Sequence, residues 1–133
     1  MDKKITVMLV DDNRIDLFIH NEFIKQMKIA HSVIEYSFAK DAIIFLQNAD
    51  SSIWPELILL DIHMPIMNGF DFLDEYILLP EDSRKKCKII IVSSSLDKSD
   101  KQKAKSNPLV IELLEKPLNR EKLLELLKQQ KVI

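Results

Sequence analysis

Carboxylates follow two apolar stretches in the first half of the chain. Asp11 and Asp12 come directly after the β-branched and apolar stretch 5–10, and Asp61 comes directly after the apolar stretch 57–60. If both stretches are strands of one parallel sheet, the three carboxylates lie close together and repel one another, unless their pKa values rise or a cation neutralises them. Mg²⁺ prefers oxygen ligands and binds through one or two carboxylates together with a phosphate. The sequence therefore predicts a Mg²⁺ site with Asp11, Asp12 and Asp61 as metal ligands.

A hydroxyl and an ammonium group follow two later apolar stretches. Ser93 comes directly after the stretch 89–92, and Lys116 comes shortly after the stretch 110–114. At the same sheet edge, the two groups could balance and hydrogen-bond the phosphate oxygens that do not face the cation. The Asp61 carboxylate could then attack phosphorus and form an acyl phosphate. We predict Asp61 as the nucleophile, with Ser93 and Lys116 completing the catalytic set.

These side chains meet only if the strands that carry them end at one edge of a sheet. Apolar runs without polar alternation predict strands buried on both faces, and apolar positions at helical spacing between them predict helices. The predicted strands cover 5–10, 31–38, 57–60, 88–92 and 110–114, and the predicted helices cover 14–27, 39–49, 70–79, 97–106 and 119–131. This alternation predicts an α/β, doubly wound (βα)5 fold with a five-stranded parallel sheet. In such sheets ligands bind outside the carboxyl ends of the strands.

The apolar spacing in the first helix also predicts which side faces the sheet. We expect the core-facing residues to be Ile15, Phe18, Ile19, Phe23, Ile24 and Met27. The charged residues Asp16, Glu22 and Lys25 then lie on the solvent-facing side.

Other features have structural interpretations. Trp54 precedes the third strand, which predicts a position at the end of the sheet opposite Asp61. The charged segment 80–87 is long for a connection between a helix and a strand, so we predict a surface insertion. Cys87 is expected to be a packing residue, and the three histidines lack the spacing of a zinc site.

Length and composition limit the class of protein. A chain of 133 residues with 47% hydrophobic content is typical of one domain, so we expect a single domain over 1–133 and no output domain. The net charge of −2 disfavours binding to nucleic acid. The single glycine, Gly69, excludes the glycine-rich phosphate loops of nucleotide enzymes. A lone cysteine and short apolar runs predict a cytoplasmic protein without a membrane contact.

Taken together and in this order, the motifs resemble those of a response-regulator receiver domain of the CheY-like, stand-alone type. The resemblance rests on Asp11-Asp12, the segment 61–69 with the sequence DIHMPIMNG, the hydroxyl of Ser93, and Lys116 followed by proline, and it spans the whole chain. The segment 61–69 is its most specific part. The family resemblance implies a flavodoxin-like sheet with strand order 2-1-3-4-5.

The resemblance also implies a role for each site residue. Asp61 would be the phosphoacceptor, Asp12 a direct Mg²⁺ ligand and Asp11 a mostly water-mediated one. The backbone carbonyl of His63 would complete the metal site. Ser93 would be the switch hydroxyl that turns toward the phosphoryl group. Lys116 would contact the phosphate, with a cis peptide bond to the following proline.

By the same resemblance, we expect a two-component phosphorelay protein, a phosphoacceptor rather than an enzyme. A sensor histidine kinase or a histidine phosphotransfer protein would supply the phosphoryl group. A downstream protein would dock on the face formed by helix 97–106, strand 110–114 and helix 119–131. The usual switch aromatic is replaced by Leu113, and Ser94 stands where Ala or Gly is usual. We therefore expect the signal to travel through the loop 94–97.

Two other classes of protein lack residues that they require in this sequence. A haloacid-dehalogenase-like phosphatase needs a second acid two residues after the nucleophile, where His63 stands. A flavodoxin-like electron carrier needs a phosphate loop after the first strand, where Asp11 and Asp12 would repel phosphate. The alternative that stays open is a degenerate receiver, which acts as an interaction module without phosphorylation.

Overall fold

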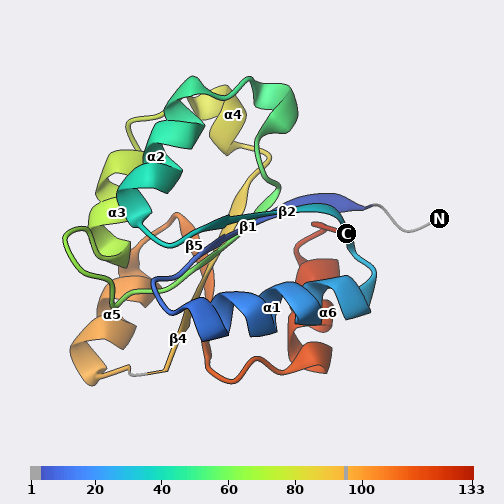
Figure 1. Cartoon of the computed structure of the whole chain (residues 1–133). Helices are drawn as coiled ribbons and strands as arrows, with labels where there is room; N and C mark the ends of the chain where they lie inside the picture. Colours follow the sequence, from blue (N-terminus) through green and yellow to red (C-terminus); the bar gives the residue numbers. More distant parts are fainter. Residues whose placement is uncertain (1–3, 95) are drawn as a thin grey trace.

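The computed structural model describes residues 4–94 and 96–133, and Figure 1 shows their sheet lying between two helical layers. The strands are β1 (Ile5–Val10), β2 (Ala30–Tyr36), β3 (Leu57–Leu60), β4 (Lys88–Ser93) and β5 (Val110–Glu115). They pair in parallel in the order β2-β1-β3-β4-β5. The predicted doubly wound α/β fold and its strand order are therefore confirmed. Ser95, in the loop that we expect to carry the signal, lies outside the described residues.

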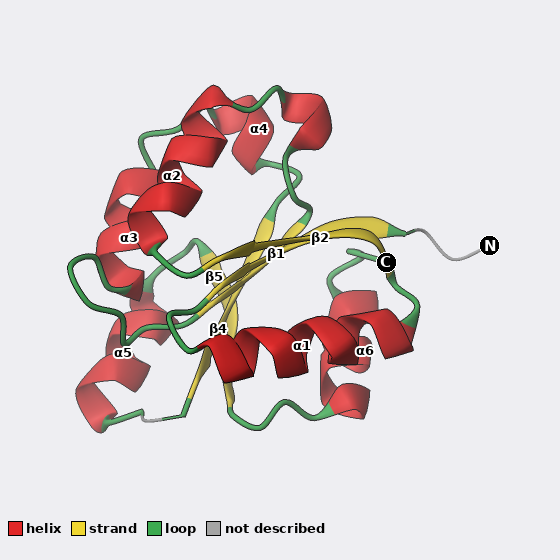
Figure 2. Ribbon diagram, viewed as in Figure 1, coloured by secondary structure: helices red, strands yellow, loops and turns green. Residues whose placement is uncertain are grey.

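The helices divide between the two faces of the sheet (Figure 2). They are α1 (Arg14–Met27), α2 (Ala39–Asn48), α3 (Gly69–Tyr76), α4 (Glu81–Arg84), α5 (Lys98–Ser106) and α6 (Arg120–Gln129), with a short 3₁₀ helix η1 (Ser51–Ile53). One hydrophobic cluster joins α1 and α6 to the sheet, and a second joins α2, α3 and a residue of α5 to the opposite face. In the described part of the chain, no helix is long and apolar enough to cross a membrane.

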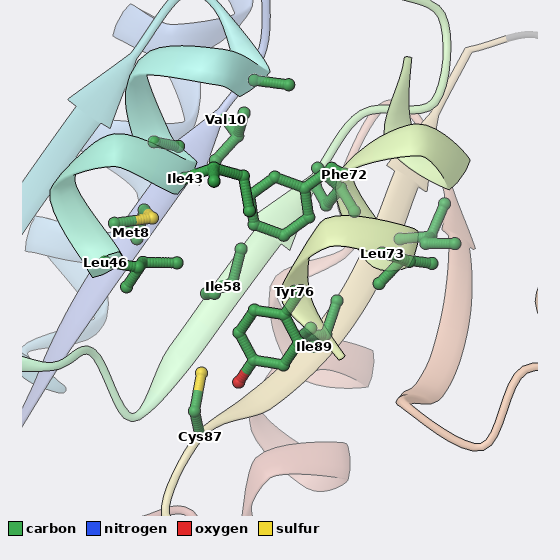
Figure 3. Close-up of a cluster of buried hydrophobic side chains, with 14 of the residues drawn as sticks. Met8, Val10, Ile43, Leu46, Ile58, Phe72, Leu73, Tyr76, Cys87 and Ile89 are labelled. Atoms are coloured by element: carbon green, nitrogen blue, oxygen red, sulfur yellow. The ribbon is translucent and has the colours of Figure 1, made fainter. Parts of the chain in front are cut away.

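The core under α2 and α3 contains the large aromatic side chains. Figure 3 shows Phe72 and Tyr76 directed from α3 toward the sheet, with the hydroxyl of Tyr76 facing Cys87. Burial raises the pKa of the Cys87 thiol to about 12, which fits the predicted packing role. Trp54 is buried just before β3 and donates a hydrogen bond to the Leu46 carbonyl at 3.2 Å. It lies before the amino end of the strand whose carboxyl end carries Asp61, as predicted.

The segment 80–87, predicted as a surface insertion, contains the one-turn helix α4. Arg84 Nε donates a hydrogen bond to the Leu79 carbonyl at 2.9 Å, and Ser83 is buried. The segment is therefore a structured connection that is tied by Arg84 to Leu79, in the turn after α3.

The predicted core-facing side of α1 is partly wrong. The residues of α1 that are buried are Leu17, His20, Ile24 and Met27. By contrast, the exposed fractions of Ile15, Phe18 and Ile19 are 70%, 67% and 49%. The apolar residues of this helix lie on two sides, one with Leu17, Ile24 and Met27 and the other with Ile15, Phe18 and Ile19. The periodicity therefore fits two different faces, and the contact with the sheet decides between them.

Candidate functional site

The register of the two central strands brings the predicted acidic residues together. Val10 of β1 pairs with Leu60 of β3, and the Asp61 amide donates to the Val10 carbonyl at 2.9 Å. Carboxylate oxygens of Asp11, Asp12 and Asp61 all lie within 4.8 Å of one another. Asp11 and Asp61 are buried, whereas Asp12 is exposed. The three acids therefore form a cluster, called the acidic pocket below, that is exposed to solvent at Asp12.

The electrostatics of this pocket favour a bound cation. Burial, together with the negative charges of Asp11 and Asp12, raises the pKa of Asp61 to about 6, and the positive charge of Lys116 opposes the shift in part. The negative charge of Asp61 is therefore disfavoured first by burial and then by the neighbouring carboxylates. A set of carboxylate oxygens with an open side fits the ligand preference of Mg²⁺. The residues present therefore suit the predicted metal.

Lys116, just after β5, is the cation of the site. Its Nζ lies 2.7 Å from Asp11 Oδ2, 2.7 Å from Asp16 Oδ2 and 3.8 Å from Asp61 Oδ1. Burial alone would lower the pKa of Lys116, but the hydrogen bonds to Asp11 and Asp16 and the charge of Asp61 raise it overall. The ammonium is therefore charged at neutral pH. The peptide bond from Lys116 to Pro117 is cis, as the family resemblance implies.

Asp16 is a site residue that the apolar spacing does not predict. The spacing predicts a position on the solvent-facing side of the first helix, but the Asp16 side chain is 25% exposed and binds Lys116. The available signal was its position in the first turn of the helix that follows Asp12, where a side chain can turn back toward the sheet edge. That signal is weak, because an acid in a first helical turn is favourable without any partner.

The remaining predicted residues also lie at this edge of the sheet. Ser93 is the last residue of β4, is completely buried, and accepts a hydrogen bond at its carbonyl from the Lys116 amide at 2.9 Å. His63 lies two residues after Asp61, and its Nε2 is 3.2 Å from Asp100 Oδ2 in α5. The His63 side chain therefore links the loop after β3 to the first turn of α5.

The conformation of the loop 61–69 explains why its last two residues are asparagine and glycine. A Cβ atom at Gly69 would lie 2.7 Å from the Asp61 carbonyl oxygen and 2.9 Å from Ile62 Cα, so no larger residue fits without movement of the backbone. Asn68 caps α3, because its side-chain oxygen accepts a hydrogen bond from the Asp71 backbone amide at 2.9 Å. In return, the Asp71 carboxylate accepts a hydrogen bond from the Asn68 backbone amide at 3.0 Å. Together these contacts hold α3 directly against the chain at Asp61.

Comparison with known proteins agrees with this geometry. The family model described as "Response regulator receiver domain" matches residues 7–128. A protein-glutamate methylesterase/protein-glutamine glutaminase 3 from Leptospira interrogans is 32% identical over 115 residues, which are 85% of this chain and 30% of that protein. A putative two-component response regulator, ARR13 from Arabidopsis thaliana, is 40% identical over 67 residues, which are 50% of this chain and 11% of that protein. The chain thus spans less than a third of these curated relatives.

Solved structures of similar length also match. A response regulator receiver protein from Dyadobacter fermentans has 38% identity and a TM-score of 0.85, and the match covers 93% of this chain and 95% of that one. A two-component response regulator from Cytophaga hutchinsonii has 29% identity and a TM-score of 0.84, with coverage of 96% and 97%. Motifs, strand order and family match therefore lead to one conclusion: this chain belongs to the family of response regulator receiver domains.

Proposed function

We propose that this protein is a two-component response regulator that accepts a phosphoryl group on Asp61 in a Mg²⁺-dependent reaction. The observation that carries the proposal is the cluster of Asp11, Asp12 and Asp61 within 4.8 Å, with the Lys116 ammonium beside it. A nucleophilic carboxylate, carboxylate oxygens for a divalent cation and a fixed positive charge are the groups that transfer to an aspartate requires.

The proposed reaction moves the phosphoryl group from a phosphohistidine to an Asp61 carboxylate oxygen. The bond from oxygen to phosphorus forms as the bond from nitrogen to phosphorus breaks, and the imidazole nitrogen of the donor keeps the electron pair. Asp12 and Asp61, the carbonyl of His63 and, through water, Asp11 would hold Mg²⁺. When bound, the cation would neutralise the charge of the phosphoryl oxygens. The ammonium of Lys116 and the hydroxyl of Ser93 would each bind a phosphoryl oxygen.

The proposed output is a change in affinity for a downstream protein at the face of α5, β5 and α6. Of the α5 residues, all of which the structure describes, Ala104 alone is buried. Polar contacts supplement this packing: Asp100 Oδ2 lies 3.2 Å from His63 Nε2, and Lys103 Nζ lies 5.5 Å from the centre of the Phe70 ring. A helix with little apolar burial shifts at low cost, so new contacts at the phosphoryl group could move α5.

Intact-protein mass spectrometry tests the phosphoacceptor. The protein is incubated with acetyl phosphate and Mg²⁺, and in parallel with a phosphohistidine phosphotransfer protein. We expect one phosphate adduct in the wild type, none in Asp61→Asn, and an unchanged adduct in the control Asp74→Asn, which alters an exposed acid of α3. If no donor gave an adduct, or if Asp61→Asn still formed it, the protein would instead be an interaction module that works without phosphorylation.

A further inference from the structure

The Lys116 ammonium is directed toward two carboxylates other than that of Asp61. Its Nζ is at 2.7 Å from both Asp11 and Asp16, which is the length of a strong charge-assisted hydrogen bond. The distance to Asp61 Oδ1 is 3.8 Å, beyond hydrogen-bonding range. In the unphosphorylated protein, two of the three N–H groups of this lysine therefore donate hydrogen bonds to Asp11 and Asp16, and not to Asp61.

The two acceptors differ in how firmly they are held. The Asp11 side chain is 6% exposed, and its Oδ1 also accepts a hydrogen bond from the Asn13 amide at 2.9 Å. The Asp16 side chain is 25% exposed and faces a cavity of about 430 Å³, which Lys116 and His20 also line. Water in this cavity could solvate Asp16 if the lysine left, whereas the side chain of Asp11, 6% exposed, is less accessible to water. Asp16 is therefore the acceptor that Lys116 can give up at lower cost.

We propose that Asp16 is a positioning residue, which retains Lys116 on the α1 side of the pocket until a phosphoryl group on Asp61 competes for it. The inference rests on the proposed function of Asp61. A phosphoryl group brings additional negative charge next to Asp61 and needs a donor among the N–H groups of Lys116. Because Nζ lies 3.8 Å from Asp61 Oδ1, it must move toward the phosphoryl oxygens, and this movement gives up its 2.7 Å hydrogen bond to Asp16. Asp16 therefore opposes phosphorylation.

The same contact favours the unphosphorylated, metal-bound form. An ammonium drawn toward Asp16 is kept away from the carboxylate of Asp61, and so competes less with a divalent cation for that group. Without the charge of Asp16, the lysine would approach Asp61, the affinity for a divalent cation would fall, and the affinity for a phosphoryl group would rise. The two affinities are thus expected to change in opposite directions, which a general loss of structure would not produce.

The central variant is Asp16→Asn, which keeps the side-chain size and removes the charge. The matched control is Glu22→Gln, which removes an acid of the same helix that pairs with Lys25 at 3.8 Å. Beryllofluoride with saturating Mg²⁺ is the phosphoryl probe, and Mn²⁺ alone is the metal probe, read by water proton relaxation. We expect Asp16→Asn to bind beryllofluoride roughly 3- to 10-fold more tightly and Mn²⁺ more weakly than the wild type, since one charge-assisted bond of a partly exposed pair is lost. Glu22→Gln should match the wild type in both.

A second readout does not depend on phosphorylation. In protein labelled with ¹⁵N-lysine, the Lys116 Nζ signal of free Asp16→Asn should shift toward its position in the beryllofluoride-bound wild type, and Asp16→Glu should restore the original position. Circular dichroism checks that each variant is folded, and Asp16→Ser replaces Asp16→Asn if it is not. Weaker beryllofluoride binding in Asp16→Asn, or affinities equal to those of Glu22→Gln, would overturn the inference. If the wild type took up neither phosphate nor beryllofluoride, the proposed function would fail. The difference in the Lys116 Nζ signal between the free wild type and free Asp16→Asn, and its reversal in Asp16→Glu, would still decide whether Asp16 positions Lys116.

Discussion

At the scale of single residues, Asp61 occupies a setting that suits a metal-bound carboxylate better than a free one. Burial and the charges of its acidic neighbours raise its pKa from 3.8 to about 6. An acid with a higher pKa in the folded than in the unfolded state binds more protons when folded, so stability falls as the pH rises between the two values. For Asp61 the loss begins near its ordinary value of 3.8 and is complete above about pH 6.

The substitution Asp61→Asn removes this charge while keeping the size of the side chain. We expect it to raise the free energy of unfolding of the metal-free protein by on the order of 2 kcal/mol at pH 8, and to have little effect at pH 4. Urea unfolding in the presence of a chelator measures both values. Added Mg²⁺ should stabilise the wild type at pH 8 and have a much smaller effect on the variant. An equal effect of the substitution at the two pH values would contradict this account of Asp61.

At the scale of elements, α1 shows that a helix can bury a different side from the one its apolar spacing suggests. Leu17 and Ile24 contact the sheet, whereas Phe18 and Ile15 face solvent in the first turns after Asp12. In the proposed reaction, a phosphohistidine donor would approach Asp61 from the side where Asp12 is exposed. We expect the exposed apolar residues Ile15 and Phe18, which follow Asp12 closely in the chain, to contact such a donor.

Two adjacent substitutions in α1 separate these roles. We expect Leu17→Ala to lower the free energy of unfolding by about 2 to 5 kcal/mol, and Phe18→Ala to change it by less than about 1 kcal/mol. Thermal and urea unfolding measure the difference. Phe18→Ala should also slow transfer from a phosphohistidine protein donor, while leaving the reaction with acetyl phosphate unchanged. Comparable destabilisation by the two substitutions would show that the orientation of α1 is misassigned.

The parts of the site that sequence reasoning predicted are those fixed by the ends of the strands. Parallel strands bring their carboxyl ends to one edge, so the positions of Asp11, Asp61 and Lys116 follow once the strands are recognised. Likewise, the close approach of Gly69 to Asp61 gives a physical reason for the one glycine in the chain. Asp16 could not be predicted in the same way, because its contact with Lys116 depends on the rotation of α1 about its axis. Because apolar residues lie on two sides of α1, the sequence pattern leaves that rotation undetermined.

At the scale of the whole molecule, the helices are held to the sheet with very different strength. Helix α3 buries Phe72, Leu73 and Tyr76 against the central strands, whereas α5 buries Ala104 and otherwise lies at the surface. The ion pair of Lys101 with Glu115, at 3.7 Å, joins α5 to β5 through exposed side chains and so adds little stability. Opening of α5 should therefore cost much less free energy than opening of α3.

Amide hydrogen exchange followed by mass spectrometry tests this difference. We expect the amides of α5 to exchange faster than those of α3 in the free protein, because few buried contacts hold α5 closed. Beryllofluoride with Mg²⁺ should change the exchange of α5 and the loop before it, and leave α3 unaltered. The variant His63→Ala, which removes the partner of Asp100, should accelerate exchange in α5 without the ligand. Protection of α5 equal to that of α3 would rule out this helix as the moving element.

Because Trp54 is buried, its intrinsic fluorescence reports whether the protein is folded. Trp54 is the one tryptophan of the sequence, its exposed fraction is 1%, and it lies before the amino end of β3, away from the pocket. Its emission should change when the core opens to water and stay constant when a paramagnetic ion or a phosphoryl group occupies the pocket. Fluorescence recorded during unfolding can therefore be followed at any metal concentration without a signal from binding itself. Trp54 before β3 and Asp61 after it thus place the fluorescent side chain and the proposed phosphoacceptor at opposite ends of one strand.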